Sequence, residues 1–224
     1  MTSLANVAAQ TLQRKIAEAE YRPGEKLPSQ RELAANLGIS RTSLREAISM
    51  LEALGMVRSH PGKGVFITKG TTRQPGEVPK GPASAQPDEV FQLRYIVEPA
   101  AASLAARNPK VDVAFLEDAQ REMEAALDRL DLVMAAEWDM TFHRRLAEQS
   151  GNAALVEMLH QSESQIAYSL RLPFANAQRI WEPVDEHRQI IRAIADRDAL
   201  AAQRAMQTHL LRAAARIGIR FVQP

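Results

Sequence analysis

Apolar residues recur every three to four positions through most of the chain, which is the spacing of helices that bury one face. Near the N-terminus this pattern predicts a first helix that starts around Leu4 and ends before the turn signal Arg22-Pro23-Gly24. Ser29 is placed to cap a short second helix and Ser40 a third, because a serine side chain accepts hydrogen bonds from the free N–H groups of a first helical turn. Gly55 is placed to end the third helix.

Two helices joined by a short turn at Gly38 predict a helix-turn-helix, whose second helix usually enters the major groove of DNA. The outward residues at the start of that helix are polar or basic: Arg41, Thr42, Ser43 and Arg45. Arginine can donate two hydrogen bonds to a guanine edge, and hydroxyl groups suit phosphate oxygens. Taken alone, the two helices also fit a protein-interaction module.

Residues 56–59 and 64–67 alternate like two short strands around a small cationic turn, His60-Pro61-Gly62-Lys63. A tip of this kind is suited to touch the minor groove or the backbone of DNA. The hairpin therefore favours a winged helix-turn-helix, with three helices and a small β-hairpin wing, over a protein-interaction module.

The rest of the chain has helical periodicity, and no strand pattern competes with it. The first predicted helix contains Val90 and Ala105, and Pro99 inside it is expected to kink or reset it. Further helices are predicted near 112–128, 131–149, 153–170, 176–195 and 198–220. Short separators between them predict an antiparallel bundle of about six helices, so the fold class is mainly α.

Charge and proline content divide the chain into three parts. The net charge is only +1, but residues 1–70 hold ten basic and six acidic groups, and residues 91–224 carry a net charge of −2. A basic end is expected if that end meets a polyanion. Residues 70–88 hold four of the twelve prolines and little apolar periodicity, which predicts an extended linker. The two domains are therefore expected at residues 1–69 and 89–224.

The composition excludes several classes of protein. The chain has no cysteine, which rules out disulfide scaffolds, cysteine-rich zinc modules and thiol catalysis. The first residues carry no secretory signal, and no apolar run approaches the ~18 residues that a membrane helix needs. We therefore expect a cytoplasmic, nucleoid-associated protein that has no membrane partner.

Four of the five histidines lie in the helical part, and three of them have a spacing that suits a metal site. Asp139 and His143 are four residues apart, so both project from one face of a helix. His187 lies about ten residues before the turn at 196–198, and His209 lies about eleven after it. In antiparallel helices these two histidines would lie at one level. The four residues would then form a site of three nitrogens and one oxygen, which suits Zn, Ni, Mn or Fe.

The alternative is that these histidines are surface or hydrogen-bonded residues, which is the commoner role of isolated histidines. His160 has no matching carboxylate at helical spacing, and we expect it to be structural or exposed. Asp139 and His143 could likewise form a simple surface pair.

Four segments of the N-terminal part carry a family resemblance. They are Arg22-Pro-Gly-Glu-Lys-Leu-Pro-Ser-Gln-Arg-Glu-Leu33, Gly38-Ile-Ser-Arg-Thr-Ser-Leu-Arg-Glu-Ala47, Leu51-Glu-Ala-Leu-Gly-Met-Val57 and Gly62-Lys-Gly-Val-Phe-Ile67. Over residues 8–68 they resemble the winged-helix domain of GntR-type bacterial transcription regulators. The resemblance implies that Arg31, Arg41 and Arg45 contact DNA, with Thr42 and Ser43 near the phosphates and Gly62 at the wing tip. His60 and Lys63 are weaker candidates, because wing residues vary more in that family.

The C-terminal part resembles the FCD effector domain of the FadR branch of that family, over residues 91–215. The resemblance rests on Leu93-Arg-Tyr-Ile-Val-Glu-Pro-Ala100, Asp139-Met-Thr-Phe-His143 with Ser150-Gly-Asn152, Glu186-His187 with Ile190, and Met206-Gln-Thr-His-Leu210. Metal-binding members use an Asp-x3-His pair and two later histidines. The resemblance therefore implies that Asp139, His143, His187 and His209 hold a divalent metal ion, which helps to bind a small carboxylate effector.

The same resemblance implies an effector contact from Arg94, because a guanidinium can pair with two carboxylate oxygens. The structural alternative for Arg94 is an interhelical salt bridge, such as one with Glu98. Members that bind fatty acyl-CoA lack the intact metal set, which argues against that ligand.

The main hypothesis is a ligand-responsive transcription regulator, expected to be a homodimeric repressor that reads a short palindromic operator in double-stranded DNA. A sugar acid, hydroxy acid or other small organic acid would bind at the metal and weaken operator binding, with the linker as the lever. The alternative is a metal-dependent hydrolase or isomerase with a DNA-tethering head, although no additional buried Glu or His is evident as a general base. A third hypothesis is a constitutive DNA binder whose histidines are structural.

Overall fold

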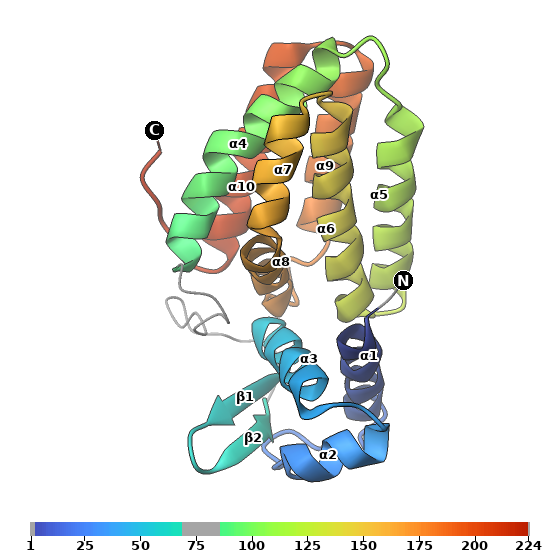
Figure 1. Cartoon of the computed structure of the whole chain (residues 1–224), viewed down its shortest axis with the longest axis vertical. Helices are drawn as coiled ribbons and strands as arrows, with labels where there is room; N and C mark the ends of the chain where they lie inside the picture. Colours follow the sequence, from blue (N-terminus) through green and yellow to red (C-terminus); the bar gives the residue numbers. More distant parts are fainter. Residues whose placement is uncertain (1–2, 69–85, 224) are drawn as a thin grey trace.

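The computed structural model describes residues 3–68 and 86–223, and it shows a small head below a helical body (Figure 1). The elements of the head are α1 (Leu4–Ala17), α2 (Gln30–Leu37), α3 (Arg41–Ala53), β1 (Val57–His60) and β2 (Gly64–Ile67). Those of the body are α4 (Pro87–Arg107), α5 (Val113–Asp128), α6 (Leu132–Gln149), α7 (Ala153–Gln161), α8 (Glu163–Arg171), the 3₁₀ turn η1 (Leu172–Ala175), α9 (Glu182–Ala195) and α10 (Ala199–Arg216). The fold class is confirmed: a winged helix-turn-helix is followed by an all-α bundle.

The helices of the head begin where serines cap them. Ser29 Oγ accepts a hydrogen bond from the Glu32 N–H over 3.2 Å, and Ser40 Oγ accepts one from the Ser43 N–H over 3.0 Å. Gly38 ends α2 with a φ of 65°, a left-handed conformation that glycine adopts without strain. These caps set the short turn between α2 and α3.

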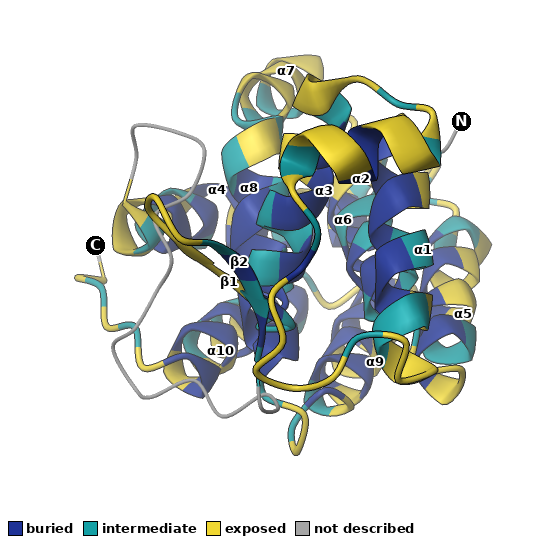
Figure 2. Cartoon of the chain, turned by 90° about the horizontal axis from the view of Figure 1, so that it is seen from below, coloured by how far each residue is buried: buried dark blue, intermediate teal, exposed yellow. Residues whose placement is uncertain are grey.

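The wing is a two-stranded antiparallel hairpin. Val57 pairs with Ile67 and His60 with Gly64, so the turn occupies residues 61–63, one residue later than the spacing predicted. Val57 and Ile67 are buried, which fastens the hairpin to the core of the head. The tip of the wing is exposed (Figure 2).

The body differs from the predicted bundle in two places. The segment predicted as one helix over 153–170 is two helices, α7 and α8, so the described residues of the body contain seven helices rather than six. The break falls at Ser162, whose φ of −104° and ψ of 12° lie off the helical values. The predicted helix 176–195 starts later, at Glu182, because 176–181 forms turns and Pro183 favours the first turn of a helix. Pro99 does not interrupt α4, which continues to Arg107.

The head packs directly on the body. Leu12 of α1 and Leu44 of α3 are fully buried in a cluster that continues into the body through Met123 of α5 and Val133 of α6. Of the linker predicted at 70–88, residues 70–85 lie outside the described residues, whereas Pro87 and Asp88 already form the first turn of α4. Within 3–68 and 86–223, no helix is long and apolar enough to cross a membrane.

Candidate functional site

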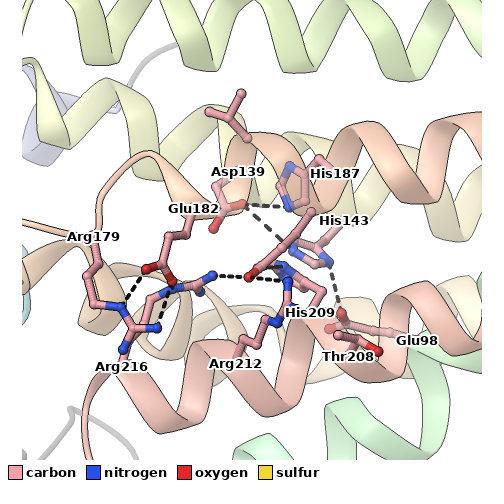
Figure 3. A network of polar contacts seen from close by, with 12 residues as sticks. Glu98, Asp139, His143, Arg179, Glu182, His187, Thr208, His209, Arg212 and Arg216 are labelled. Carbon is pink, nitrogen blue, oxygen red and sulfur yellow. Dashed lines mark hydrogen bonds and ion pairs between the residues drawn. The ribbon is translucent and has the colours of Figure 1, made fainter.

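Three helices of the body bring four predicted ligands together (Figure 3). Asp139 and His143 come from α6, His187 from α9 and His209 from α10. The ring centroids of His187 and His209 are 4.8 Å apart, and those of His143 and His209 are 5.2 Å apart. The three histidines each offer a ligand atom within 4.8 Å of the others. Asp139 Oδ1 lies 3.3 Å from His187 Nε2.

The turn at 196–198 explains why His187 and His209 lie at one level. α9 and α10 run antiparallel on either side of it, and Arg197 takes a φ of 58° that reverses the chain. Asp198 then caps α10 by accepting hydrogen bonds from the N–H groups of Leu200 and Ala201. The helix spacing therefore places the two rings opposite each other, as the sequence predicts.

Each of the three imidazoles has a partner outside the cluster, and for His143 it is Glu98 Oε2, which lies 2.8 Å from Nδ1. His187 Nδ1 lies 3.0 Å from Gln120 Oε1, and His209 Nδ1 lies 2.8 Å from Glu186 Oε2. Because Nδ1 of each ring is engaged, its Nε2 faces the centre of the cluster. Metal-binding histidines usually have such a partner on the second ring nitrogen, which sets the tautomer and the ring orientation.

The atoms that meet at the centre lack hydrogen-bond partners. Asp139 Oδ1, His187 Nε2 and His209 Nε2 are all buried, and none makes a hydrogen bond within the described residues. A buried polar atom without a partner costs about 1–3 kcal/mol, so such atoms seldom gather without a ligand. Two imidazole nitrogens and a carboxylate oxygen are the donors that a divalent cation of the zinc or nickel type prefers. The residues present thus fit a metal ion.

Burial changes the protonation of these ligands. It raises the pKa of Asp139 to about 6, although the charges of His143 and Arg94 act in the opposite direction. Burial also lowers the pKa of His187 and His209 well below 6.5, aided by neighbouring positive charges. Both histidines are therefore neutral at pH 7, which is the form that coordinates a metal.

Arg94 makes the salt bridge with Glu98 that was its structural alternative, within α4 rather than between helices, and it also borders the cluster. Its Nε donates to Glu98 Oε1 over 2.6 Å, which is the salt bridge of the structural alternative. Its Nη2 lies 3.3 Å from His143 Nε2, so the guanidinium also borders the cluster. Burial alone would raise the pKa of Glu98, but the charges of Arg94 and His143 outweigh it and hold that pKa well below its usual range.

Arg216, at the end of α10, is a candidate that the sequence reasoning missed. It pairs with Glu186 and, over 3.0 Å, with Glu182, while its buried Nη1 has no partner within the described residues. Arg216 is seven residues after His209, so both lie on the same face of α10 two turns apart. That spacing is the signal that could have revealed it.

Two buried acids lie at the cluster, and the sequence indicated neither of them as a general base. Glu98 and Glu186 are 2% and 4% exposed, respectively. Each is paired with an arginine, so neither is a free general base. Glu186 could have been found as the neighbour of His187 in the sequence. Gln120 could not, because only the packing of α5 against α9 brings it there.

His160 lies outside the cluster. Its side chain is 71% exposed, as expected, but Glu163 Oε2 is 3.7 Å away, three residues along the chain, so the expectation that no carboxylate stands at helical spacing is wrong. His160 lines the mouth of a cavity of about 90 Å³ between α6, α7 and α8. His143 and Glu98 also line that cavity, so the cavity adjoins the histidine cluster.

The predicted DNA-contacting residues lie on exposed parts of the head. Arg31 on α2, and Arg41, Thr42 and Arg45 on α3, are exposed, as are His60, Gly62 and Lys63 on the wing. Ser43 is half-buried, and its hydroxyl lies 2.9 Å from that of Ser40. His60 packs edge-on against Phe66, a contact between the two strands of the wing.

Comparison with known proteins agrees with this architecture. The family profile described as "Bacterial regulatory proteins, gntR family" matches residues 4–67, and the FCD domain profile matches residues 89–212. The Uxu operon transcriptional regulator of Escherichia coli (strain K12) is 32% identical over 203 residues, which cover 87% of this chain and 79% of that protein. The HTH-type transcriptional regulator LutR of Bacillus subtilis (strain 168) is 29% identical and covers 87% and 92%.

Among solved structures, that of Lar, which controls the expression of the Listeria monocytogenes agr system, matches over 97% of this chain and 97% of that chain. Its TM-score is 0.53 and its sequence identity is 22%, so this likeness concerns the fold alone.

Proposed function

The chain belongs to the GntR family of bacterial regulatory proteins and carries an FCD domain, and on that premise we propose that it is a metal-dependent, ligand-responsive repressor. The family and the relatives are DNA-binding transcriptional regulators, not enzymes. A hydrolase or isomerase with a DNA-tethering head is therefore set aside. The proposal assigns residues 1–69 to DNA binding, 70–88 to a linker and 89–224 to effector binding and dimerisation, in a cytoplasmic, nucleoid-associated protein.

The DNA-binding part of the proposal rests on the exposed residues of the head. Arg41 and Arg45 stand at the N-terminal end of α3, where a recognition helix meets base edges in the major groove. Arg31 and the wing residues Gly62 and Lys63 flank that helix and would contact the sugar-phosphate backbone or the minor groove. Two such heads in a homodimer would read a short palindrome.

An exposed apolar stripe on α4 supports the homodimer. Ile96 and Leu104 are 54% and 36% exposed, and Ala100 between them is exposed as well. Apolar side chains at these spacings share one face of a helix, and a second copy that packed there would remove them from water.

The metal part rests on the unpartnered inward atoms of Asp139, His187 and His209, and this is the observation that carries the proposal. Together with His143 these residues would hold Zn, Ni, Mn or Fe. When bound, the metal would supply a positive centre that attracts a carboxylate oxygen of the effector.

The effector proposed is a small organic acid, such as a hydroxy acid or a sugar acid. A second carboxylate oxygen could be bound by Arg94 or by the free Nη1 of Arg216. Arg216 is the stronger candidate of the two, because Arg94 already uses its guanidinium on Glu98, Ser169 and His143. The cavity that adjoins His143 and Glu98 offers room beside the metal.

Two measurements test the proposal. Equilibrium dialysis of the purified protein with Zn²⁺ should show one tightly bound ion per chain, and His187→Ala or His209→Ala should lose it, while His160→Ala, which alters an exposed histidine, should retain it. An operator selected from random double-stranded DNA should then be released when an acid from a panel of hydroxy and sugar acids is added. Zero metal stoichiometry in the parent protein would support the constitutive DNA binder, and operator affinity unchanged by every acid would contradict the effector role.

A further inference from the structure

The head and the body meet at the start of the helix that carries two of the metal ligands. α1 of the head lies against the turn between α5 and α6, where Leu130 has a φ of 54° and Asp131 caps α6 (Figure 1). Gln13 points into this contact and is 8% exposed. It lies about 120 residues from its partners in the sequence, so the contact is purely tertiary.

Gln13 completes the first turn of α6. Its Oε1 accepts a hydrogen bond from the Val133 N–H over 3.1 Å, and its Nε2 donates to the Leu130 carbonyl over 3.0 Å. The next free N–H, that of Met134, donates to Asp131 Oδ1. The N–H groups of a first helical turn have no partner within the helix, so a side chain of the head here caps a helix of the body.

Asp131 receives a second contact from the head. Gln10 Nε2 donates to Asp131 Oδ2 over 2.8 Å, while Gln13 Nε2 lies 3.4 Å from Asp131 Oδ1. The carboxylate is thus held by two glutamines of α1 and in turn caps α6. Movement of α6 relative to α1 would break these bonds.

α6 links this contact to the metal cluster. Val133 and Asp139 are six residues apart on one continuous helix, which corresponds to about 9 Å along its axis. On the head side, Leu12 of α1 packs in one core with Leu44 of α3, so the recognition helix moves with α1. An uninterrupted chain of packed elements therefore runs from Asp139 to α3.

A second contact supports the head on a different element. The C-cap region of α3 lies on η1, where a Cβ placed on Gly55 would be 3.0 Å from Ala175 Cβ. Because α1 rests on α6 and α3 rests on η1, a shift of α6 relative to η1 would tilt the head on the body.

From this arrangement we propose that Gln13 and Asp131 are positioning residues that couple the occupancy of the metal centre to the orientation of the DNA-binding head. The inference rests on the proposed function, since it assumes that the centre is a sensing site. In this proposal the packed contact between α1 and α6, and not the linker, transmits the change from the body to the head.

The absence of cysteine allows a direct test by spin labelling. Labels at Asn36→Cys, exposed on α2, and Arg192→Cys, whose side chain on α9 is 86% exposed, report the distance between head and body by double electron–electron resonance. In the labelled parent, adding Zn²⁺ after EDTA treatment should shift the mean distance by about 2 Å or more, the scale of helix shifts in switching proteins. Gln13→Leu should abolish this shift and still bind one Zn²⁺ per chain in dialysis.

Two further variants complete the design. Thr11→Ala is the matched control, because the Thr11 hydroxyl bonds the Val7 carbonyl of its own helix, and it should keep the full shift. Asp131→Asn keeps one oxygen for capping but loses the acceptor for Gln10, so it should reduce the distance shift. If circular dichroism shows that Gln13→Leu is unfolded, the result for Asp131→Asn decides the test.

The outcomes separate the inference from the proposed function. An unchanged shift in Gln13→Leu, or no shift in a parent that binds Zn²⁺, would overturn the coupling and leave the metal site standing. A parent that binds no Zn²⁺ would overturn the metal site and the coupling together.

Discussion

His209 and Glu186 form a buried pair in which His209 Nδ1 donates to Glu186 Oε2 over 2.8 Å. This bond turns Nε2 of the same ring toward His143 and His187. Arg216, which lies two turns after His209 on α10, forms an ion pair with Glu186 and balances its charge.

Glu186→Gln should therefore weaken metal binding without removing a ligand. An amide is a poorer acceptor for the histidine N–H, and loss of such outer partners typically costs 10–100-fold in metal affinity. Competition with a chromophoric chelator measures the change. Asp185→Asn is the control, because Asp185 is the preceding residue on α9 and is exposed. Equal affinities in the two variants would mean that Glu186 does not orient a ligand.

Metal affinity should depend on pH through Asp139. Its pKa is raised by burial to about 6, so the carboxylate is ionised above that pH and holds a proton below it. Burial lowers the pKa values of His187 and His209 well below 6.5, so these rings take up protons at a lower pH than a free imidazole does. Since a cation must displace the Asp139 proton, Zn²⁺ affinity should fall about tenfold per pH unit below about pH 6. Calorimetry in buffers of different ionisation enthalpy should show about one proton released at pH 5. If the pH dependence of Zn²⁺ affinity instead began at pH 6.5 and corresponded to two or three protons, the histidines would be titrating in their usual range.

Arg45→Ala should relax sequence discrimination. If the guanidinium contacts a guanine edge, its loss should reduce the difference in binding free energy between the selected operator and a variant changed at that base pair. The expected reduction is about 1–3 kcal/mol. Fluorescence anisotropy with both DNAs measures the difference. Lys63→Ala on the wing should instead lower the affinity for both DNAs alike and reduce the salt dependence of binding. A uniform loss in Arg45→Ala would reassign that residue to the phosphate backbone.

Gly55→Ala should destabilise the protein more than Gly38→Ala does. Both glycines have a positive φ, 72° and 65°, so each alanine costs about 1 kcal/mol in backbone strain. At Gly38 the added Cβ meets nothing within 4 Å, whereas at Gly55 it meets Ala175 at 3.0 Å. The contact should add about 1 kcal/mol or more for Gly55→Ala in urea unfolding. Equal losses of unfolding free energy in the two variants would show that the contact between α3 and η1 accommodates the added Cβ at no cost in stability.

Much of this fold could be predicted from local patterns. Helical periodicity located the bundle, serine caps located α2 and α3, and Gly38 marked the turn between them, because each depends on neighbours within one or two turns. The break at Ser162 escaped prediction, although residues 160–165 are all polar and interrupt the apolar spacing between Leu159 and Ile166.

The candidate site was predictable in part for the same reason. Asp139 and His143 are four residues apart on one helix, and a turn between α9 and α10 sets the level of His187 and His209. The sequence by itself therefore determined the fold class and brought out the four candidate metal ligands.

Only the tertiary structure decided what surrounds that set. Gln120 reaches His187 from α5, the pairing of Arg216 with Glu186 joins two helices, and Gln13 caps α6 from another part of the chain. These contacts bridge 30 to 120 residues of sequence. Local periodicity cannot specify them, because the choice among possible partners is made by how whole helices pack against one another.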